Sequence, residues 1–274
     1  MIMKHLEAAV EHVRKLGYVP VYAALYGSQN YGLDIYGESY QSDYDVKVVV
    51  MPTLYDVVYE KCRVSTTIEY EGGQIDLKDA LSMTEMFLKM NPSYLEILQT
   101  PFYLVFPGGE YMEELRSLLP TLLIERAPIF AKASYGHFQE KIKKMSHVTS
   151  STAEKIKKYG YDGKHAHHAF RLKLMLEDFE KTGRVVLHPP TDSVAYLLRL
   201  KANDVPLEEV LPQVQLWHDQ FVACAERIIA SCEVIKDSAD HALSKTRQAL
   251  YLALKSPTEI NSVMDAREVN ANGK

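Results

Sequence analysis

The sequence predicts an α+β protein in which a small mixed β-sheet with helices is followed by a helical region. Short apolar and β-branched runs between turn residues are concentrated before residue 110, and helical periodicity dominates after it. The chain has 274 residues, of which 47% are hydrophobic, enough for a proper core. We therefore expect a sheet domain over residues 1–110, a helical domain over 111–260 and a flexible tail over 261–274.

Turn residues divide the first 110 residues into the expected elements. Gly17 ends an amphipathic helix, Pro52 ends a strand, and Gly72-Gly73 marks a hairpin turn. Asn91-Pro92 separates two helices, because the residue before a proline avoids the helical conformation. The resulting order is a helix over 2–16, strands over 18–26, 43–51, 64–70 and 74–77, and helices over 82–90 and 92–98.

The remainder of the chain has apolar residues at helical spacing. Asp162 is the expected N-cap and Gly183 the expected C′ residue of a central helix. The expected helices cover residues 110–119, 128–146, 152–158, 163–181, 193–201 and 213–235.

The net charge of −5 argues against a general nucleic-acid coat protein, but the charge is unevenly distributed. Residues 126–173 contain eleven Lys and Arg against three Asp and Glu, a net +8. Such a stretch is typical of a polyanion-binding face, and a solvated Lys-rich helical surface is the alternative.

The chain has no apolar run of the roughly 18–20 residues needed to span a bilayer, and its N-terminus does not resemble a signal peptide. Cys62, Cys224 and Cys232 have no metal-binding spacing, which favours reduced thiols. We expect a cytoplasmic protein of a bacterium or a phage-infected host cell.

The most informative pattern is a small-residue turn followed by two spaced carboxylates. Gly27 and Ser28 follow the first expected strand, and Asp43 and Asp45 lead the second. Side chains alternate along a strand, so Asp43 and Asp45 would project from the same face and repel each other without a cation between them. Oxygen ligands suit Mg²⁺, and turn N–H groups can hold phosphates. The pattern indicates a metal-dependent nucleotide site.

A third carboxylate would allow two metal ions to be held. Asp76 is the best candidate, because its strand can pair beside the second one, and it could also accept the proton of an attacking hydroxyl. The rivals are Glu69, Glu71 and Asp79. Lys47 continues the face of Asp43 and Asp45, where it would contact a triphosphate or form a structural ion pair.

A second group of candidates lies on the central helix. Lys164, His168 and Arg171 have i, i+4 and i+7 spacing and would share one face of its first turns. A cationic face near a helix N-terminus suits phosphate. The alternatives are a structural basic helix and a zinc site, and the histidines lack the Cys or carboxylate partners that zinc requires.

These residues carry a resemblance to a known family. The chain resembles the DNA polymerase β superfamily of nucleotidyltransferases, and more narrowly its bacterial and phage branch called RNA repair pathway nucleotidyltransferases. The matching blocks are Gly27-Ser28 with Tyr31-Gly32 and Ser42-Asp43-Tyr44-Asp45, then residues 91–98, then residues 161–172. Gln29 departs from the pattern, because a basic residue is expected there, and the loop over 33–41 is slightly long.

The resemblance implies a polymerase-β-like fold and metal-dependent nucleotidyl transfer, with Gly27 and Ser28 as the phosphate-binding turn and Asp43 and Asp45 as metal ligands. We expect a nucleoside triphosphate such as ATP to bind between this turn and the helix over 164–171. Two Mg²⁺ ions, or Mn²⁺, would lie on Asp43, Asp45 and Asp76. The expected acceptor is an RNA hydroxyl, such as a tRNA end. The rivals are nucleotidylation of a protein and a nucleotide-binding module without catalysis.

Overall fold

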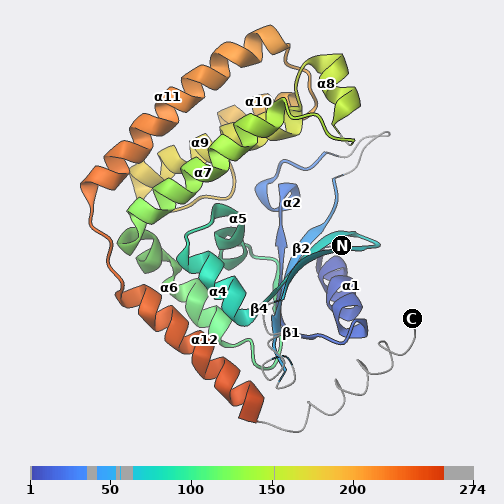
Figure 1. Ribbon diagram of the computed structural model, residues 1–274, viewed down its shortest axis with the longest axis vertical. Helices are drawn as coiled ribbons and strands as arrows, with labels where there is room; N and C mark the ends of the chain where they lie inside the picture. Colours follow the sequence, from blue (N-terminus) through green and yellow to red (C-terminus); the bar gives the residue numbers. More distant parts are fainter. Residues whose placement is uncertain (1, 36–41, 54–55, 57–63, 151, 256–274) are drawn as a thin grey trace.

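The computed structural model describes residues 2–35, 42–53, 56, 64–150 and 152–255 (Figure 1). The expected tail over 261–274 and most of the loop over 33–41 lie outside the described residues. The α+β class and the helical C-terminal region are confirmed, since a mixed sheet occupies the first half of the chain and helices occupy the second.

The sheet contains five strands in the order β3-β4-β2-β1-β5. β2 and β4 are parallel, and the other neighbouring pairs are antiparallel. The edge strand β5 was not among the predicted strands, because three residues are too few to show a period. The strand bounds are β1 Val19–Tyr26, β2 Asp45–Met51, β3 Ser65–Tyr70, β4 Gly73–Asp79 and β5 Tyr103–Val105.

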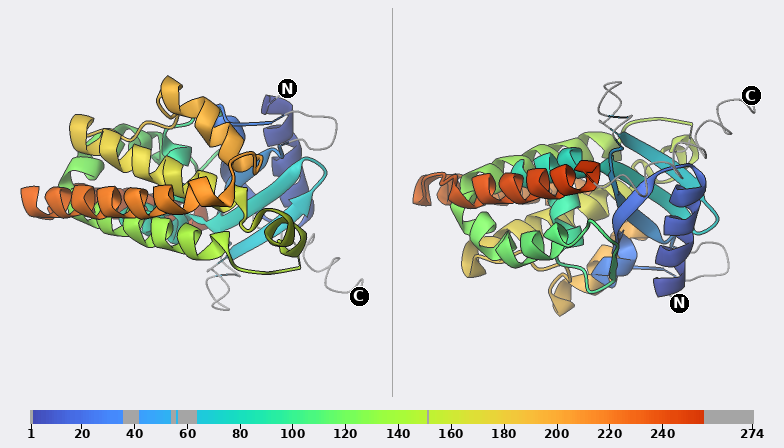
Figure 2. Two further views of the ribbon diagram at one scale, coloured as in Figure 1. Left: turned by 90° about the horizontal axis from the view of Figure 1, so that it is seen from above. Right: turned by 90° about the horizontal axis from the view of Figure 1, so that it is seen from below.

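Alternation along β2 separates two hydrophobic layers. Val46, Val48 and Val50 pack with the apolar side of α1 (Ile2–Lys15), which covers one face of the sheet. Val49 and Met51 belong to the cluster on the opposite face, which the other helices cover (Figures 1 and 2). Asp45 and Lys47 share the parity of Val49 and Met51, so the strand period directs both toward the helices.

One hydrophobic cluster continues from the sheet into the helical region. It includes Tyr22 of β1 and residues as distant in sequence as Trp217 and Ala242, all buried. The helix bounds are α2 Ser28–Tyr31, α4 Ala80–Leu88, α5 Pro92–Leu95, η1 Glu96–Leu98, α6 Tyr111–Glu125, α7 Ala127–Met145, α8 Ala153–Tyr159, α9 Gly163–Thr182, α10 Thr191–Lys201, α11 Leu207–Ser231 and α12 Asp237–Lys255.

The central helix α9 has the expected ends. The Asp162 carboxylate accepts a hydrogen bond of 2.9 Å from the Lys164 N–H, and Gly183 adopts the left-handed conformation with φ 66°. α11 differs from the prediction in its bounds, and α12 is not among the expected helices. α11 begins at Leu207 and contains Pro212, and the end predicted at residue 235 falls at Ser231. Packing on α7 and α9 outweighs the one backbone hydrogen bond that Pro212 removes.

Candidate active site

The small-residue turn lies where β1 ends. Residues 27–32, which we call the Gly27 turn, contain the short helix α2 and place both terminal glycines at positive φ, 85° for Gly27 and 66° for Gly32. A Cβ atom on Gly27 would lie 3.1 Å from Asp45 Oδ2. The turn and the carboxylate are thus in close contact, and a glycine is required between them by both space and conformation.

Asp43 and Asp45, which we call the acid pair, lie at the start of β2. The register pairs Asp45 with Tyr26, the last residue before the Gly27 turn. Burial raises the pKa of Asp45, the charge of Lys164 lowers it, and the charge of Asp43 raises it further. The two carboxylates therefore repel each other in a partly desolvated position, as the sequence pattern predicts.

Asp76 lies on β4 at the position paired with Lys47. Its carboxylate is 2.8 Å from Lys47 Nζ and 3.8 Å from Lys78 Nζ. Within the described part of the chain, no three acidic, histidine or cysteine side chains lie close enough together to hold a metal ion. Asp76 instead pairs with Lys47, because the strand register places this lysine opposite it.

The rival acidic residues lie elsewhere. Asp79 is fully buried and caps α4 by accepting a 2.9 Å hydrogen bond from the Ser82 N–H. Glu69 and Glu71 are exposed, Glu69 on the edge strand β3 and Glu71 in the hairpin turn that follows it. Asp76 is thus the only one of the four candidates that shares a contact network with the β2 face.

The sequence allows two roles for Lys47, a structural ion pair or a contact with a triphosphate. In the structure Lys47 forms the ion pair, with Asp76. It is 2% exposed, and its ammonium lies 3.7 Å from the ring centre of Tyr26 and 4.3 Å from that of Tyr94. Burial lowers its pKa, while the bond to Asp76 raises it. The ion pair with Asp76 and the contacts with the two aromatic rings hold this lysine against the sheet.

The three cationic candidates of α9 have different environments. Lys164 is exposed, and its charge acts on Asp45. Arg171 is buried, with its guanidinium carbon 3.6 Å from the ring centre of Tyr31. Burial and neighbouring positive charges lower the pKa of His168 well below its ordinary value. His168 is therefore a neutral imidazole near pH 7 and adds no positive charge to this face of α9.

Two lysines from different helices act on the acid pair, and we call Lys164 of α9 and Lys201 of α10 the basic wall. The pKa of Lys201 is lowered by burial and by Lys164, and raised by Asp34, Asp45 and Asp43. The pKa of Lys141 is likewise lowered by burial and by the charge of Lys164. The two carboxylates at the start of β2 thus interact with the ammonium groups of the basic wall, and Lys141 adds a third positive charge beside Lys164.

Several contacts of this site have no signal in the sequence. The buried Glu96 accepts hydrogen bonds from the Gly27 N–H, at 3.1 Å, and from the Tyr31 hydroxyl. Burial raises the pKa of Glu96 to about 8, although Arg171 and the Gly27 N–H lower it. Lys201 donates to the Leu33 carbonyl at 2.8 Å. These partners are 65 or more residues apart, so no local pattern could reveal them.

Only part of the basic stretch over 126–173 is free to meet a polyanion. Arg126 donates to the Leu88 carbonyl, and Lys173 pairs with Glu177 at 2.9 Å. Arg171 is buried. The exposed members lie on α7, α8 and the start of α9, and they are Lys132, Lys143, Lys144, Lys155, Lys157, Lys158 and Lys164.

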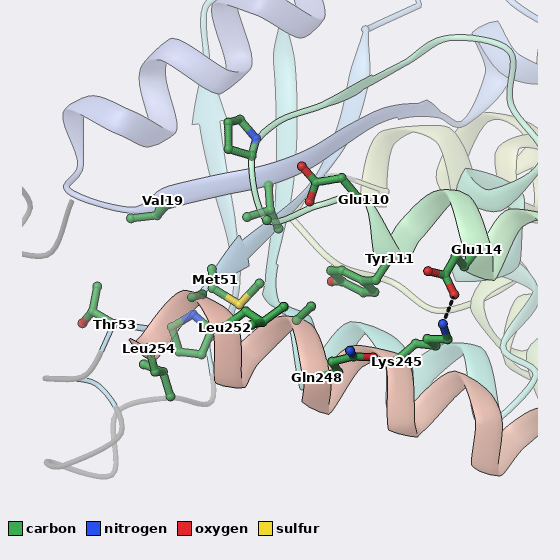
Figure 3. Close-up of a pocket in the computed structure, with 16 residues that line it drawn as sticks. Val19, Met51, Thr53, Glu110, Tyr111, Glu114, Lys245, Gln248, Leu252 and Leu254 are labelled. Atoms are coloured by element: carbon green, nitrogen blue, oxygen red, sulfur yellow. Dashed lines mark ion pairs between the residues drawn. The ribbon is translucent and has the colours of Figure 1, made fainter. Parts of the chain in front are cut away.

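A large cavity of about 590 Å³ lies at the opposite end of β1 and β2 (Figure 3). Val19 and Met51, the outer ends of these strands, line it together with Tyr111 of α6 and Leu252 of α12. The Lys245 ammonium and the Glu114 carboxylate pair at 2.7 Å beside it (Figure 3). None of the predicted site residues lines this cavity.

The described helices include none with the length and apolar character of a membrane span. No curated protein matches the chain. Among solved structures, a nucleotidyltransferase-like protein from Exiguobacterium sibiricum 255-15 is similar to this chain, with 13% sequence identity and a TM-score of 0.31. The alignment covers 90% of this chain and 75% of the chain of that protein. A likeness this distant carries no argument about the site.

Family membership is decided by a match that covers most of the chain. The family described as RlaP, the RNA repair pathway DNA polymerase beta family, matches residues 2–243. This range includes the Gly27 turn, the acid pair, the block over 91–98 and all of α9. The resemblance inferred from the sequence motifs is confirmed: the chain belongs to the RNA repair pathway DNA polymerase beta family and is a nucleotidyltransferase.

Proposed function

We propose that this enzyme transfers a nucleotidyl group from a nucleoside triphosphate to a hydroxyl group of RNA, with divalent metal ions held by the acid pair. The observation that carries the proposal is the contact between Asp45 and the Gly27 turn, with Asp43 beside it and the basic wall opposite. Carboxylates, turn N–H groups and ammonium groups are the three kinds of group that a metal-bound triphosphate requires.

The acid pair fits a hard divalent cation. Both side chains supply oxygen ligands, and Asp45 is half-buried with a pKa raised by burial and by Asp43. A cation would relieve the repulsion and the desolvation together. Mg²⁺ needs few protein ligands when phosphate oxygens complete its shell, so two carboxylates are an adequate protein contribution. When bound, the metal supplies charge stabilisation at the reacting phosphate.

The residues around the acid pair would then orient the substrates. The Gly27 turn would hold the phosphate chain, and Lys164 would bind its negative charge. In the transfer, a bond forms between the acceptor oxygen and the α-phosphorus, the bond from this phosphorus to the bridging oxygen breaks, and pyrophosphate leaves. Asp76 is our candidate for the group that accepts the acceptor's proton, which requires it to loosen its contact with Lys47.

RNA is the acceptor that the surface charge supports best. Beside Lys164, six exposed lysines of α7 and α8 add positive charge to the helical region, and such groups can neutralise the phosphates of RNA. The family description also links these enzymes to RNA repair.

The test is to incubate the protein with each α-labelled nucleoside triphosphate and Mg²⁺, with and without total RNA, and to follow the label. We expect RNA to be labelled by the wild type and not by Asp45→Asn. Label on a protein band would replace RNA by a protein acceptor. Tight triphosphate binding without label transfer to any acceptor would indicate a module without catalysis.

A further inference from the structure

Glu96 connects both sides of the Gly27 turn to the body of the protein. It opens the short helix η1, and only 2% of its surface is exposed. Its Oε1 accepts a 3.1 Å hydrogen bond from the Gly27 N–H, and its Oε2 accepts one from the Tyr31 hydroxyl. Because these two groups come from opposite ends of α2, one carboxylate sets the conformation of the whole turn.

Arg171 approaches the same turn from the helical region. Its guanidinium carbon lies 3.6 Å from the ring centre of Tyr31, and only 8% of its surface is exposed. Burial lowers the pKa of Arg171 to about 10 and raises that of Glu96 to about 8, and the charge of each residue opposes the shift of the other. Tyr31 therefore lies between the two residues, with its ring against the Arg171 guanidinium and its hydroxyl on the Glu96 carboxyl group.

Further contacts join the turn to the helical region. His188, after α9, has Nδ1 3.1 Å from the Tyr31 carbonyl oxygen. Lys201 of α10 donates to the Leu33 carbonyl at 2.8 Å and to the Ser42 hydroxyl at 3.2 Å. Figure 1 shows α2 between the sheet and the layer formed by α7, α9 and α10. The turn is thus held from two sides.

A buried carboxyl group held in this way does more than fill space in the core. A polar side chain in the interior costs free energy unless hydrogen bonds compensate, and removing one partner leaves the other unsatisfied. A Leu at position 96 would avoid that cost but could not bond the Gly27 N–H. The carboxylate therefore supplies what an apolar residue cannot, which is a fixed backbone at the turn.

We infer that Glu96 and Arg171 are positioning residues for nucleotidyl transfer: Glu96 fixes the backbone of the Gly27 turn by hydrogen bonds, and Arg171 locks Tyr31 and Glu96 in place from α9. The inference rests on the proposed function, in which this turn holds the phosphate chain. A turn displaced by about 1 Å would misalign the α-phosphorus, and such misplacement can cost a factor of about 100 in rate.

The first test measures the turn directly in the full-length protein without ligand. Amide hydrogen exchange is followed at Gly27, whose N–H bonds Glu96, and at Asn30 and Leu33, whose N–H groups bond carbonyls within the turn. Glu96→Ala and Arg171→Ala should accelerate exchange at these amides at least about tenfold, with the strands of the sheet unaffected. Glu96→Gln should restore protection at Gly27, because its amide oxygen can accept the same bond.

The matched control is Glu180→Gln, which removes a carboxylate that is ion-paired with an arginine elsewhere in the protein. Glu180 accepts from Arg227 at 2.9 Å on the helical surface, away from the turn. Its variant should leave exchange at the Gly27 turn unchanged. If Glu96→Ala fails to fold, Glu96→Gln and Arg171→Lys decide whether the two residues hold the turn. Glu96→Gln keeps an acceptor for the Gly27 N–H, and Arg171→Lys keeps the positive charge, in side chains of similar size.

The second test measures transfer by the same variants. Arg171→Lys keeps the charge but loses the planar stacking, and we expect kcat to fall by about 10- to 100-fold while KM for the triphosphate changes by less than about threefold. A lowered melting temperature with unchanged turn exchange, or faster turn exchange with wild-type kcat, overturns the inference. If the wild type transfers no nucleotide at all, the proposed function fails, and the exchange data still decide whether Glu96 and Arg171 hold the turn.

Discussion

The two ends of strands β1 and β2 differ in the kind of surface they present. At one end the Gly27 turn contacts the acid pair, with the basic wall opposite. At the other end Val19 and Met51 line a cavity of about 590 Å³ with the apolar side of α12 (Figure 3). The first end is rich in charges that lack full compensation, and the second is spacious and has its ion pair satisfied at 2.7 Å.

This difference shows that volume is a poor guide to the chemistry of this enzyme. A cavity supplies room and apolar contact, which suit binding of a small apolar molecule. Phosphoryl transfer instead needs positioned charges, and these are concentrated at the end with the Gly27 turn and the acid pair. Substitutions at the two ends should therefore separate cleanly in their effects on transfer.

The largest expected effect is from neutralising the acid pair. Asp43→Asn and Asp45→Asn should each lower kcat/KM for nucleotidyl transfer by at least about 1,000-fold, because an amide binds Mg²⁺ far more weakly than a carboxylate. The measurement is the rate of label transfer with Mg²⁺ in excess, together with a melting curve to show that the fold is kept.

The control lies at the opposite end of the strands. Leu252→Ser changes an exposed side chain that lines the large cavity. It should leave transfer within about twofold of wild type. Loss of activity in this variant, with wild-type activity in Asp45→Asn, would move the catalytic site to the cavity.

The next effect concerns the acceptor. Binding of single-stranded RNA should weaken with salt, with a slope near 0.7 per phosphate contacted. Four contacts would give about a 50-fold loss of affinity over a fourfold rise in salt. Fluorescence anisotropy with labelled RNA measures the slope, and combining Lys155→Ala with Lys157→Ala on α8 should reduce it by about one to two contacts. A slope of zero would argue for a protein acceptor.

Lys164 is expected to have a smaller effect, confined to the triphosphate. Charge-assisted hydrogen bonds contribute on the order of 1.5–3 kcal/mol, so Lys164→Ala should raise the KM of the triphosphate about tenfold or more. Lys158→Ala, on the exposed surface of α8, provides the matched comparison and should leave that KM unchanged. Steady-state kinetics at saturating acceptor distinguish the two variants, and equal KM values would remove Lys164 from the triphosphate site.

The parts of this comparison that the sequence could predict are those with local causes. Asp162 and Gly183 mark the ends of α9, because capping depends on residues within one helical turn. Asp45 and Lys47 share a face of β2 because side chains alternate along every strand. The acid pair beside the Gly27 turn follows from the same kind of reasoning, with the family resemblance added.

The parts that it could not predict depend on depth and register. Helical spacing places Lys164 and Arg171 on one side of α9, but it does not reveal that one is exposed and the other buried. The pairing of Asp76 with Lys47 depends on a parallel register between β2 and β4. The role of Glu96 depends on contacts with residues 65 and 69 positions away. No short stretch of the sequence contains both partners of these contacts or reveals the depth at which a residue is buried.

The smallest expected effect lies behind the site, where His167 joins α9 to α10. Its ring is 1% exposed, and its Nδ1 lies 2.9 Å from the Leu197 carbonyl, which fits a neutral imidazole that donates from Nδ1. Burial lowers the pKa of His167 to about 3, from an ordinary value of 6.5. Below pH 6.5 the unfolded chain therefore binds a proton that the folded protein excludes, and the free energy of unfolding falls as the pH falls toward 3.

At about 1.4 kcal/mol per pH unit, this histidine should cost about 2 kcal/mol of stability at pH 5 relative to pH 7. His167→Asn keeps a donor for the Leu197 carbonyl but cannot titrate. Urea unfolding at pH 7 and pH 5 should therefore show a smaller loss of stability in the variant than in the wild type, by about this amount, whatever the other titrating groups contribute to both. Equal losses in the two proteins would mean that folding does not lower the pKa of His167, so that its imidazole is protonated in the folded protein at pH 5.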